Sequence, residues 1–141
     1  MLKLYRDMEE AEEDGKPVIG FVSKHLGVRI KDVTVGSDDT FDIEVDEEGN
    51  THPDTGGVSV TPPCVNTNIK RFSLSRLMKR KTVLWEIDES ELAQFGLKYR
   101  QDPDDPSHGF IEPANSMAAR ELVSRVNKTR DFWRKSNDLQ L

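Results

Sequence analysis

Residues 53–60, Pro-Asp-Thr-Gly-Gly-Val-Ser-Val, constrain the possible fold more than any other part of this chain. A Pro-Asp-Thr-Gly sequence is typical of a tight turn, in which Gly56 supplies a positive φ. Because adjacent glycines have no Cβ, they also allow a ligand to approach the backbone closely. The segment is therefore either a hairpin with a glycine bulge or a ligand-binding turn. The alternation after it predicts a short strand, with Val58 and Val60 facing the core and Ser59 facing the other way.

The length and composition fit a single domain, residues 1–141, with long surface loops. A chain of 141 residues can bury a core without disulfides, although 33% of its residues are charged and 35% are hydrophobic. Cys64 is the only cysteine, which excludes an internal disulfide and favours a reducing, cytoplasmic compartment. The sequence has no apolar run of membrane-spanning length and no signal-peptide pattern at its start, so we expect no membrane association.

Charge is unevenly distributed along the chain. Residues 1–60 carry 15 acidic and 6 basic side chains, whereas residues 61–141 carry 11 acidic and 14 basic ones. Since the net charge is −6, we do not expect nucleic-acid binding, but the second half could hold an anionic ligand. An acid-free interval, residues 55–85, contains a basic group made of Lys70, Arg71, Arg76, Lys79, Arg80 and Lys81. This basic group is either a solvated face or a rim that attracts phosphate.

Hydrophobic periodicity predicts a mixed fold of the α+β class. We expect strands at residues 1–6, 40–46, 58–60, 82–87 and 108–113, and helices at residues 17–28, 73–79, 88–95 and 115–135. The final helix has a stripe that should be buried, consisting of Ala118, Leu122, Val126, Thr129 and Trp133. We also expect Trp85 to lie in the core.

The strand expected at residues 108–113 places three functional side chains on one face. In a pleated strand, His108, Phe110 and Glu112 point the same way. A histidine beside an aromatic ring and a carboxylate can act as a donor, a base or a stacking partner, or it can simply cap a loop. The three histidines and Cys64 lack ligand-like spacing, so we expect no metal site. A Ser-His-Asp hydrolase is unsupported, because the chain has no Gly-x-Ser-x-Gly nucleophile elbow.

Three segments occur in an order that is similar to a known family. They are Leu-Tyr-Arg at residues 4–6, the Pro-Asp-Thr-Gly-Gly-x-Ser-Val motif at residues 53–60, and His-x-x-Ile-x-Pro at residues 108–113, followed by Met117. The chain resembles the small ADP-ribosyltransferase-like toxins delivered by bacterial type VI secretion. This resemblance implies antiparallel sheets that enclose a dinucleotide cleft, with NAD as the substrate. It also implies an antibacterial effector that acts in the cytoplasm of a target cell, modifies a macromolecular acceptor and has a neutralising protein partner.

The resemblance also implies roles for particular residues. Catalysis would fall to His108, Ser59 and Glu112, the last as a substitute for the glutamate that related transferases place late in the chain. NAD would be bound by Arg6, Tyr5, Thr55, Gly56, Gly57, Ser59 and Phe110. In this interpretation the arginine contacts phosphate or ribose, the glycine backbone meets the nicotinamide amide or ribose, and an aromatic ring stacks on nicotinamide.

Two alternative functions come from different classes. One is a non-catalytic binder of the antitoxin or immunity type, because the acidic first half would suit a basic partner. The other is an RNA-processing enzyme similar to an RNA 2′-phosphotransferase, which the basic group would support. The sequence does not distinguish transfer of ADP-ribose from hydrolysis of the dinucleotide.

Overall fold

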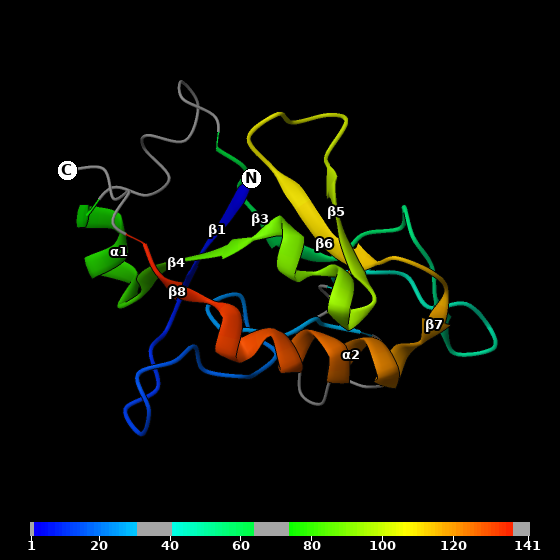
Figure 1. The fold of residues 1–141 in the computed structure, drawn as a ribbon, viewed down its shortest axis with the longest axis horizontal. Coiled ribbons are helices and arrows are strands. Elements are labelled where there is room, and N and C mark those ends of the chain that lie inside the picture. Colours follow the sequence, from blue (N-terminus) through cyan, green and yellow to red (C-terminus); the bar gives the residue numbers. More distant parts are fainter. Residues whose placement is uncertain (1, 31–40, 64–73, 137–141) are drawn as a thin grey trace.

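The computed structural model describes residues 2–30, 41–63 and 74–136 (Figure 1). Within these residues the chain forms three antiparallel sheets with two α-helices and three short 3-10 helices. One sheet has the order β1 (Lys3–Met8), β4 (Val83–Asp88), β8 (Arg134–Lys135). A second has the order β3 (Val58–Val60), β6 (Gly109–Pro113), β5 (Leu97–Gln101), and the smallest pairs β2 (Asn50–Thr51) with β7 (Met117–Ala118). The expected mixed α/β architecture with antiparallel sheets and a C-terminal helix is confirmed.

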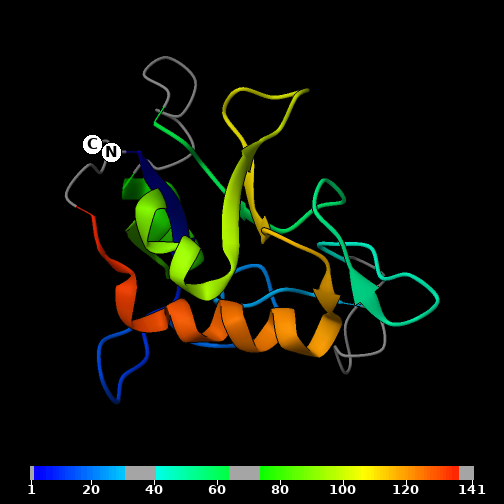
Figure 2. The same cartoon turned by 45° about the vertical axis from the view of Figure 1, so that its right-hand side comes forward.

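The helices are α1 (Leu74–Arg80) and α2 (Ala119–Lys128), with 3-10 turns η1 (Glu89–Glu91), η2 (Ala93–Phe95) and η3 (Thr129–Phe132). Figure 2 shows α2 running along one side of the molecule, with the strands of both three-stranded sheets on the same side of it. Among the residues that the structure describes, none of the helices has the length and apolar character needed to cross a bilayer.

A single main core joins both three-stranded sheets to α2. On β1, Leu4 and Met8 are fully buried, as period-two alternation requires. Trp85 of β4 is buried beside them and its Nε1 donates to the Met8 carbonyl at 3.1 Å. Trp133 is also buried, and its Nε1 donates to Thr129 Oγ1 at 3.1 Å. The prediction that both tryptophans lie in the core is therefore confirmed.

The C-terminal helix is shorter than expected. It begins at Ala119 rather than near residue 115, because the two preceding residues pair with β2 as strand β7. Ala118, in an extended conformation at the helix start, is exposed, and Ala119 is buried in its place. The rest of the expected stripe is buried as predicted, namely Leu122, Val126, Thr129 and Trp133.

Two expected elements are wrong. Residues 17–28 form a loop rather than a helix, with an isolated bridge between Ile19 and Leu26. A Cβ on Gly27 would lie 2.0 Å from the Gly20 carbonyl oxygen, so this glycine serves close backbone approach instead of ending a helix. Residues 41–46 form no strand either, but only a bridge between Ile43 and Gly56. Residue 40 of that prediction, and residue 73 of the predicted helix at 73–79, lie outside the described residues.

The two three-stranded sheets meet at one pair of residues. The Tyr5 N–H donates to the Thr61 carbonyl at 2.9 Å, and the Thr61 N–H donates to the Tyr5 carbonyl at 2.8 Å. This bridge joins β1 to the segment that follows β3. Segments about 55 residues apart in the sequence are thereby brought side by side, which is what positions the site described next.

Candidate functional site

A cavity of about 210 Å³ lies where the two sheets meet. Its lining residues come from β1, from β3 and the residue after it, from α1 and from the start of β6, and they are Tyr5, Arg6, Asp7, Ser59, Val60, Thr61, Arg76 and His108. We call it the basic cavity, after Arg6, Arg76 and His108. Four residues that the sequence analysis placed in the site are brought together here: Tyr5, Arg6, Ser59 and His108.

The Arg6 guanidinium holds the wall of the basic cavity together. Its Nη1 donates to the Ser59 carbonyl at 2.8 Å, and its Nη2 donates to the carbonyls of Ser23 and His25, each at 3.0 Å. Its Nε is buried and has no hydrogen-bond partner among the described residues. Burial lowers the pKa of Arg6, against the opposing effect of the Asp42 carboxylate. Arg6 therefore ties β1 to β3 and to the loop at residues 23–25.

His108 is oriented by a carboxylate. Its Nδ1 lies 2.9 Å from Asp102 Oδ2, and this hydrogen bond is the main cause that lowers the pKa of Asp102. With Nδ1 donating to the carboxylate, Nε2 of the neutral imidazole is left as an acceptor. The intervening loop is closed by backbone and side-chain turn bonds, including the Asp104 N–H to Asp102 Oδ1 at 2.9 Å. The Asp102–His108 pair is thus set by a proline-rich turn.

The outer face of the second sheet carries a row of interacting side chains. Val58 and Val60 are buried and Ser59 is exposed, which confirms the predicted faces of β3. Ser59 lies opposite Phe110 in the register, and Phe110 lies opposite Arg100. The Arg100 guanidinium sits 4.7 Å from the Phe110 ring centre. The His108 ring meets the same ring edge-on, at 4.7 Å between centres.

Glu112 shares this face but does not line the basic cavity. Its side chain is fully buried, and its Oε1 accepts hydrogen bonds from Arg100 Nε at 2.7 Å and from the Asp54 N–H at 3.1 Å. Its Oε2 lies 3.5 Å from Lys98 Nζ and accepts no hydrogen bond from the described residues. Because Glu112 is enclosed between two cations, it holds Arg100 and the turn at Asp54 in place.

Three residues of the central turn that were expected to bind NAD do not line the basic cavity, namely Thr55, Gly56 and Gly57. Thr55 Oγ1 donates to the His52 carbonyl at 2.8 Å, and the Gly57 N–H donates to the Asp42 carbonyl at 2.7 Å. Gly56 has φ 127°, and a Cβ there would lie 2.2 Å from that same carbonyl oxygen. A Cβ on Gly57 would lie 2.3 Å from the backbone oxygen of β6 at residue 111. The two glycines therefore serve close packing of three backbone segments, and their contact with a dinucleotide stays a prediction.

Two residues of this region were not proposed from the sequence. Arg76 belongs to the basic group, for which a phosphate-attracting rim was one of two interpretations, and it lines the cavity beside Arg6. Asp102 lies only six residues before His108, within a run of turn residues. The Asp-Pro turn signal that predicted the loop could have identified Asp102 as the partner of His108.

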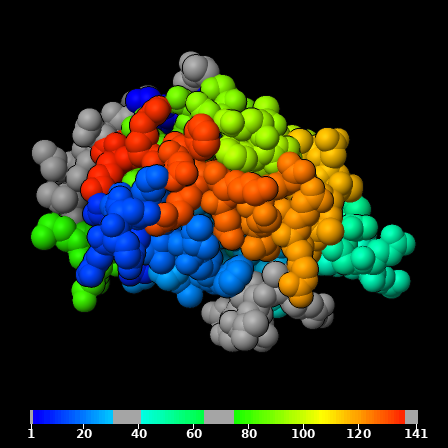
Figure 3. All heavy atoms as spheres, turned by 60° about the horizontal axis from the view of Figure 1, so that its bottom comes forward, coloured from blue at the N-terminus to red at the C-terminus, as the bar shows by residue number. Residues whose placement is uncertain are grey.

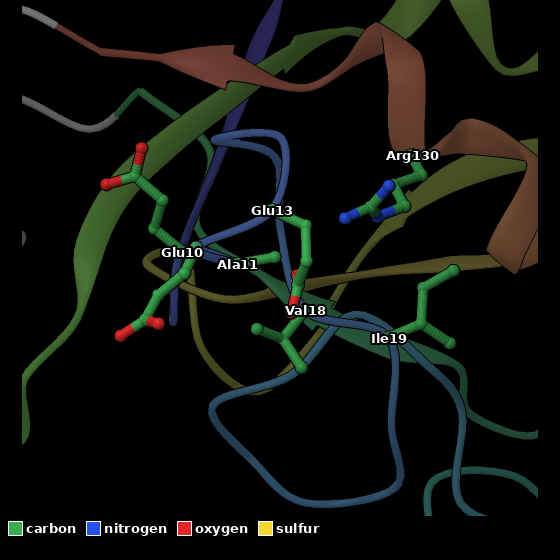
Figure 4. Close-up of a pocket in the computed structure, with 7 residues that line it drawn as sticks. Glu10, Ala11, Glu13, Val18, Ile19 and Arg130 are labelled. Atoms are coloured by element: carbon green, nitrogen blue, oxygen red, sulfur yellow. The ribbon is translucent and has the colours of Figure 1, made fainter.

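A second cavity, of about 380 Å³, lies against the N-terminal loop (Figure 4). Its lining residues are Glu10, Ala11, Glu12, Glu13, Val18, Ile19 and Arg130, and we call it the acidic cavity. Figure 3 shows this N-terminal loop, in blue, packed along the C-terminal helical segments. Arg130 donates to both carboxylate oxygens of Asp14, at 2.5 and 2.9 Å, and to the Pro17 carbonyl at 2.7 Å. This pairing lowers the pKa of Asp14 and raises that of Arg130.

Within residues 2–30, 41–63 and 74–136, no group of three or more histidine, cysteine, aspartate or glutamate side chains is arranged to hold a metal ion. Comparison of the sequence with protein-family models and with curated proteins finds no match.

Proposed function

We propose that this chain binds NAD in the basic cavity and acts as an ADP-ribosyltransferase-like enzyme with an ADP-ribosyltransferase-like fold. One observation carries the proposal. Tyr5, Arg6, Ser59 and His108 come from three distant segments and line one cavity. These are the segments on which the resemblance to the toxin family depends.

The chemistry that follows uses the side chains of the basic cavity. The bond between the anomeric carbon of the ribose and the nicotinamide nitrogen breaks, and its electron pair leaves with nicotinamide. An oxygen of water or of a macromolecular acceptor attacks the anomeric carbon, and Nε2 of His108 takes the proton of that oxygen. Asp102 stabilises the resulting imidazolium, as a carboxylate next to a histidine does. Ser59 donates a hydrogen bond to a ribose hydroxyl, and the Tyr5 ring lies beside nicotinamide.

In this proposal Glu112 is a positioning residue. The resemblance implies a catalytic role for Glu112, but its fully buried carboxylate is paired with Arg100 and lies outside the cavity lining. Its effect on the reaction passes through Arg100 and Phe110 to the His108 ring.

The direct test measures nicotinamide released from NAD by the purified chain, with and without a bacterial extract that supplies acceptors. Mass added to a macromolecule would identify transfer, and free ADP-ribose would identify hydrolysis. We expect Ser59→Ala to lower the rate about tenfold, the effect of one lost hydrogen bond in the site. Ser124→Ala, on the exposed side of α2, is the matched control. No release by the unaltered chain under either condition would refute the proposal.

A toxin of this kind needs a neutralising partner in the cell that makes it, and it acts in the cytoplasm of another cell. Expression in a bacterial host separates this proposal from the antitoxin-type binder. An active enzyme arrests growth, and His108→Ala restores it, whereas a non-catalytic binder has no effect on growth with or without that substitution.

A second candidate is the RNA 2′-phosphotransferase type of enzyme. It is favoured by one observation, the presence of Arg76 with Arg6 and His108 around a single cavity. RNA that carries a 2′-phosphate would then lose the phosphate in the presence of NAD, and binding of the RNA would weaken steeply as salt concentration rises.

A further inference from the structure

A serine, a histidine and an aspartate form a hydrogen-bonded chain at the small sheet of β2 and β7. His52 Nδ1 lies 2.6 Å from Ser116 Oγ, and His52 Nε2 lies 2.6 Å from Asp46 Oδ2. His52 directly follows β2 and Ser116 directly precedes β7, and these strands pair antiparallel with Thr51 opposite Met117. The strand pairing therefore brings together two side chains that are 64 residues apart in the sequence. We call this group the Ser116–His52–Asp46 triad.

The triad has the proton positions that a nucleophilic serine needs. Because the Asp46 carboxylate only accepts hydrogen bonds, the neutral ring of His52 carries its proton on Nε2. This leaves Nδ1 as the acceptor for the Ser116 hydroxyl proton. The carboxylate is itself held in place, since its Oδ1 accepts the N–H groups of Glu48 and Asn50, each at 2.9 Å. The hydrogen bond from Asn50, followed by that from His52, lowers the pKa of Asp46.

The triad is open to solvent, so that a substrate can reach it. The side chains of His52 and Asp46 are 41% and 36% exposed, and Ser116 is exposed as well. A pair as exposed as this contributes little to folding stability. Ser116 also lies two residues before Ala118, the N-cap residue of α2, which has no oxygen with which to cap the first turn. The N-terminal end of a helix favours a negative charge nearby, such as the oxygen anion of an acyl-transfer intermediate.

A cavity of about 510 Å³ adjoins the triad along the chain. Its lining consists of residues 41–45, which end directly before Asp46, and of Thr55, whose Oγ1 donates to the His52 carbonyl at 2.8 Å. Three of the lining side chains are apolar, namely Phe41, Ile43 and Val45. A partly apolar cavity of this size suits a short acyl chain.

We propose that the Ser116–His52–Asp46 triad is a second reactive site, which hydrolyses esters that carry a short apolar acyl group. Ser116 Oγ attacks the ester carbonyl carbon, and its proton passes to His52 Nδ1. The bond from that carbon to the alcohol oxygen then breaks, and the alcohol leaves with the proton from His52. Water attacks the acyl-serine next, which releases the carboxylic acid and restores the Ser116 hydroxyl. Asp46 is a positioning residue, which fixes the ring and stabilises its protonated form.

Covalent labelling of the full chain with diisopropyl fluorophosphate tests the nucleophile. Ser116 Oγ attacks phosphorus, fluoride leaves, and the serine proton passes to His52. Tryptic peptide 101–120 contains Ser107 as well as Ser116, so fragmentation mass spectrometry has an internal control. We expect label on Ser116 and none on Ser107, which is buried and donates to Asp105 Oδ1 at 2.7 Å. Labelling should fall about tenfold or more in His52→Gln.

Hydrolysis of p-nitrophenyl acetate and p-nitrophenyl butyrate tests the reaction. We expect Ser116→Ala and His52→Gln to lower the rate about 100-fold, and Ser124→Ala, on the exposed side of α2, to leave it unchanged. The butyrate should react faster than the acetate, because its longer acyl chain reaches the cavity at residues 41–45. Asp46→Asn should lower kcat and leave KM unchanged, and thermal unfolding should show that the variant is folded.

These outcomes are separate from those of the proposed function, because none of the three triad residues lines the basic cavity. Figure 1 also shows β7 at the opposite end of the molecule from α1, the helix that contributes to that cavity. Equal labelling of the unaltered chain and His52→Gln, or no label on Ser116, would overturn the second site. Equal rates for the two esters would overturn the acyl cavity. Ester hydrolysis that depends on Ser116, without release of nicotinamide from NAD, would support the triad and refute the proposed function.

Discussion

The basic cavity and the acidic cavity each have an arginine in the lining, but they differ in which charged side chains are paired. In the acidic cavity Arg130 is the neutralised group, because Asp14 and the Pro17 carbonyl occupy its donors. Of the three glutamates in the lining, Glu10 pairs with Lys135, and the other two are Glu12 and Glu13. In the basic cavity the one carboxylate of the lining is neutralised, because Arg80 binds Asp7, and outside the lining Asp102 is bound to His108. The larger cavity is therefore the more acidic of the two, and we expect it to suit an anion less well. Pairing of side chains, and not volume, decides which cavity can hold an anion.

The largest expected effect is on the buried pair of Glu112 and Arg100, which lies outside the lining of the basic cavity. Glu112→Ala removes a fully buried carboxylate and leaves Arg100 with only the exposed Asp54 carboxylate, 3.4 Å away, so we expect the free energy of unfolding to fall by about 3 kcal/mol. Denaturant unfolding followed by tryptophan fluorescence measures this. Glu121→Ala is the control, because Glu121 pairs with Arg125 on the exposed surface of α2 and should contribute only a few tenths of a kcal/mol. Equal effects of the two variants would show that the stability of the fold does not depend on the buried pair.

The next effect is on the rate of nicotinamide release, and it should differ between His108 and His52. His108→Ala should lower nicotinamide release about 100-fold, because the proton acceptor of the basic cavity is lost. His52→Ala is a close control, since His52 also pairs with an aspartate, Asp46, at 2.6 Å, but does not line the basic cavity. Similar losses of rate in both variants would remove His108 from the reaction.

The smallest effect concerns the acidic cavity and depends on pH. The Asp14 pKa is lowered below its ordinary value of 3.8 in the folded chain, mainly by Arg130, so the pair stabilises the fold above that value. This stabilisation is lost as the pH falls through the lowered pKa. Arg130→Gln should therefore reduce stability at neutral pH, and the difference from the unaltered chain should shrink as the pH drops below 3.8.

Thermal unfolding across the acid range measures that difference. Arg120→Gln, on an exposed position of α2, is the control, and nicotinamide release should be unchanged in both variants. A difference that stays constant or grows toward acid pH would contradict the role given to the Asp14–Arg130 pair.

The alternation of apolar and polar residues predicted a strand correctly where the apolar side chains do pack into the core. The alternation at residues 58–60 set Val58 and Val60 inward and Ser59 outward, and β3 has this arrangement. The pattern failed at residues 41–46, where it predicted a strand. There Phe41 is 42% exposed, and the Asp42 carboxylate accepts the Arg29 N–H at 2.7 Å. A bond from a side chain to the backbone competes with strand pairing, and periodicity carries no information about it.

The sequence by itself determined the inward and outward faces of β3 and the burial of both tryptophans. The resemblance pointed to four residues that line the basic cavity, and their roles toward NAD stay a prediction. Tertiary structure alone decided that Arg76 joins them, since its place depends on Leu77 packing against Tyr5. It also decided that Glu112 is enclosed, because Arg100 and Lys98 come from the neighbouring strand β5. The physical reason is that successive side chains of a strand point to opposite faces, so the sequence alone shows which residues share a face. Charge pairing between distant segments depends instead on which strands and helices become neighbours.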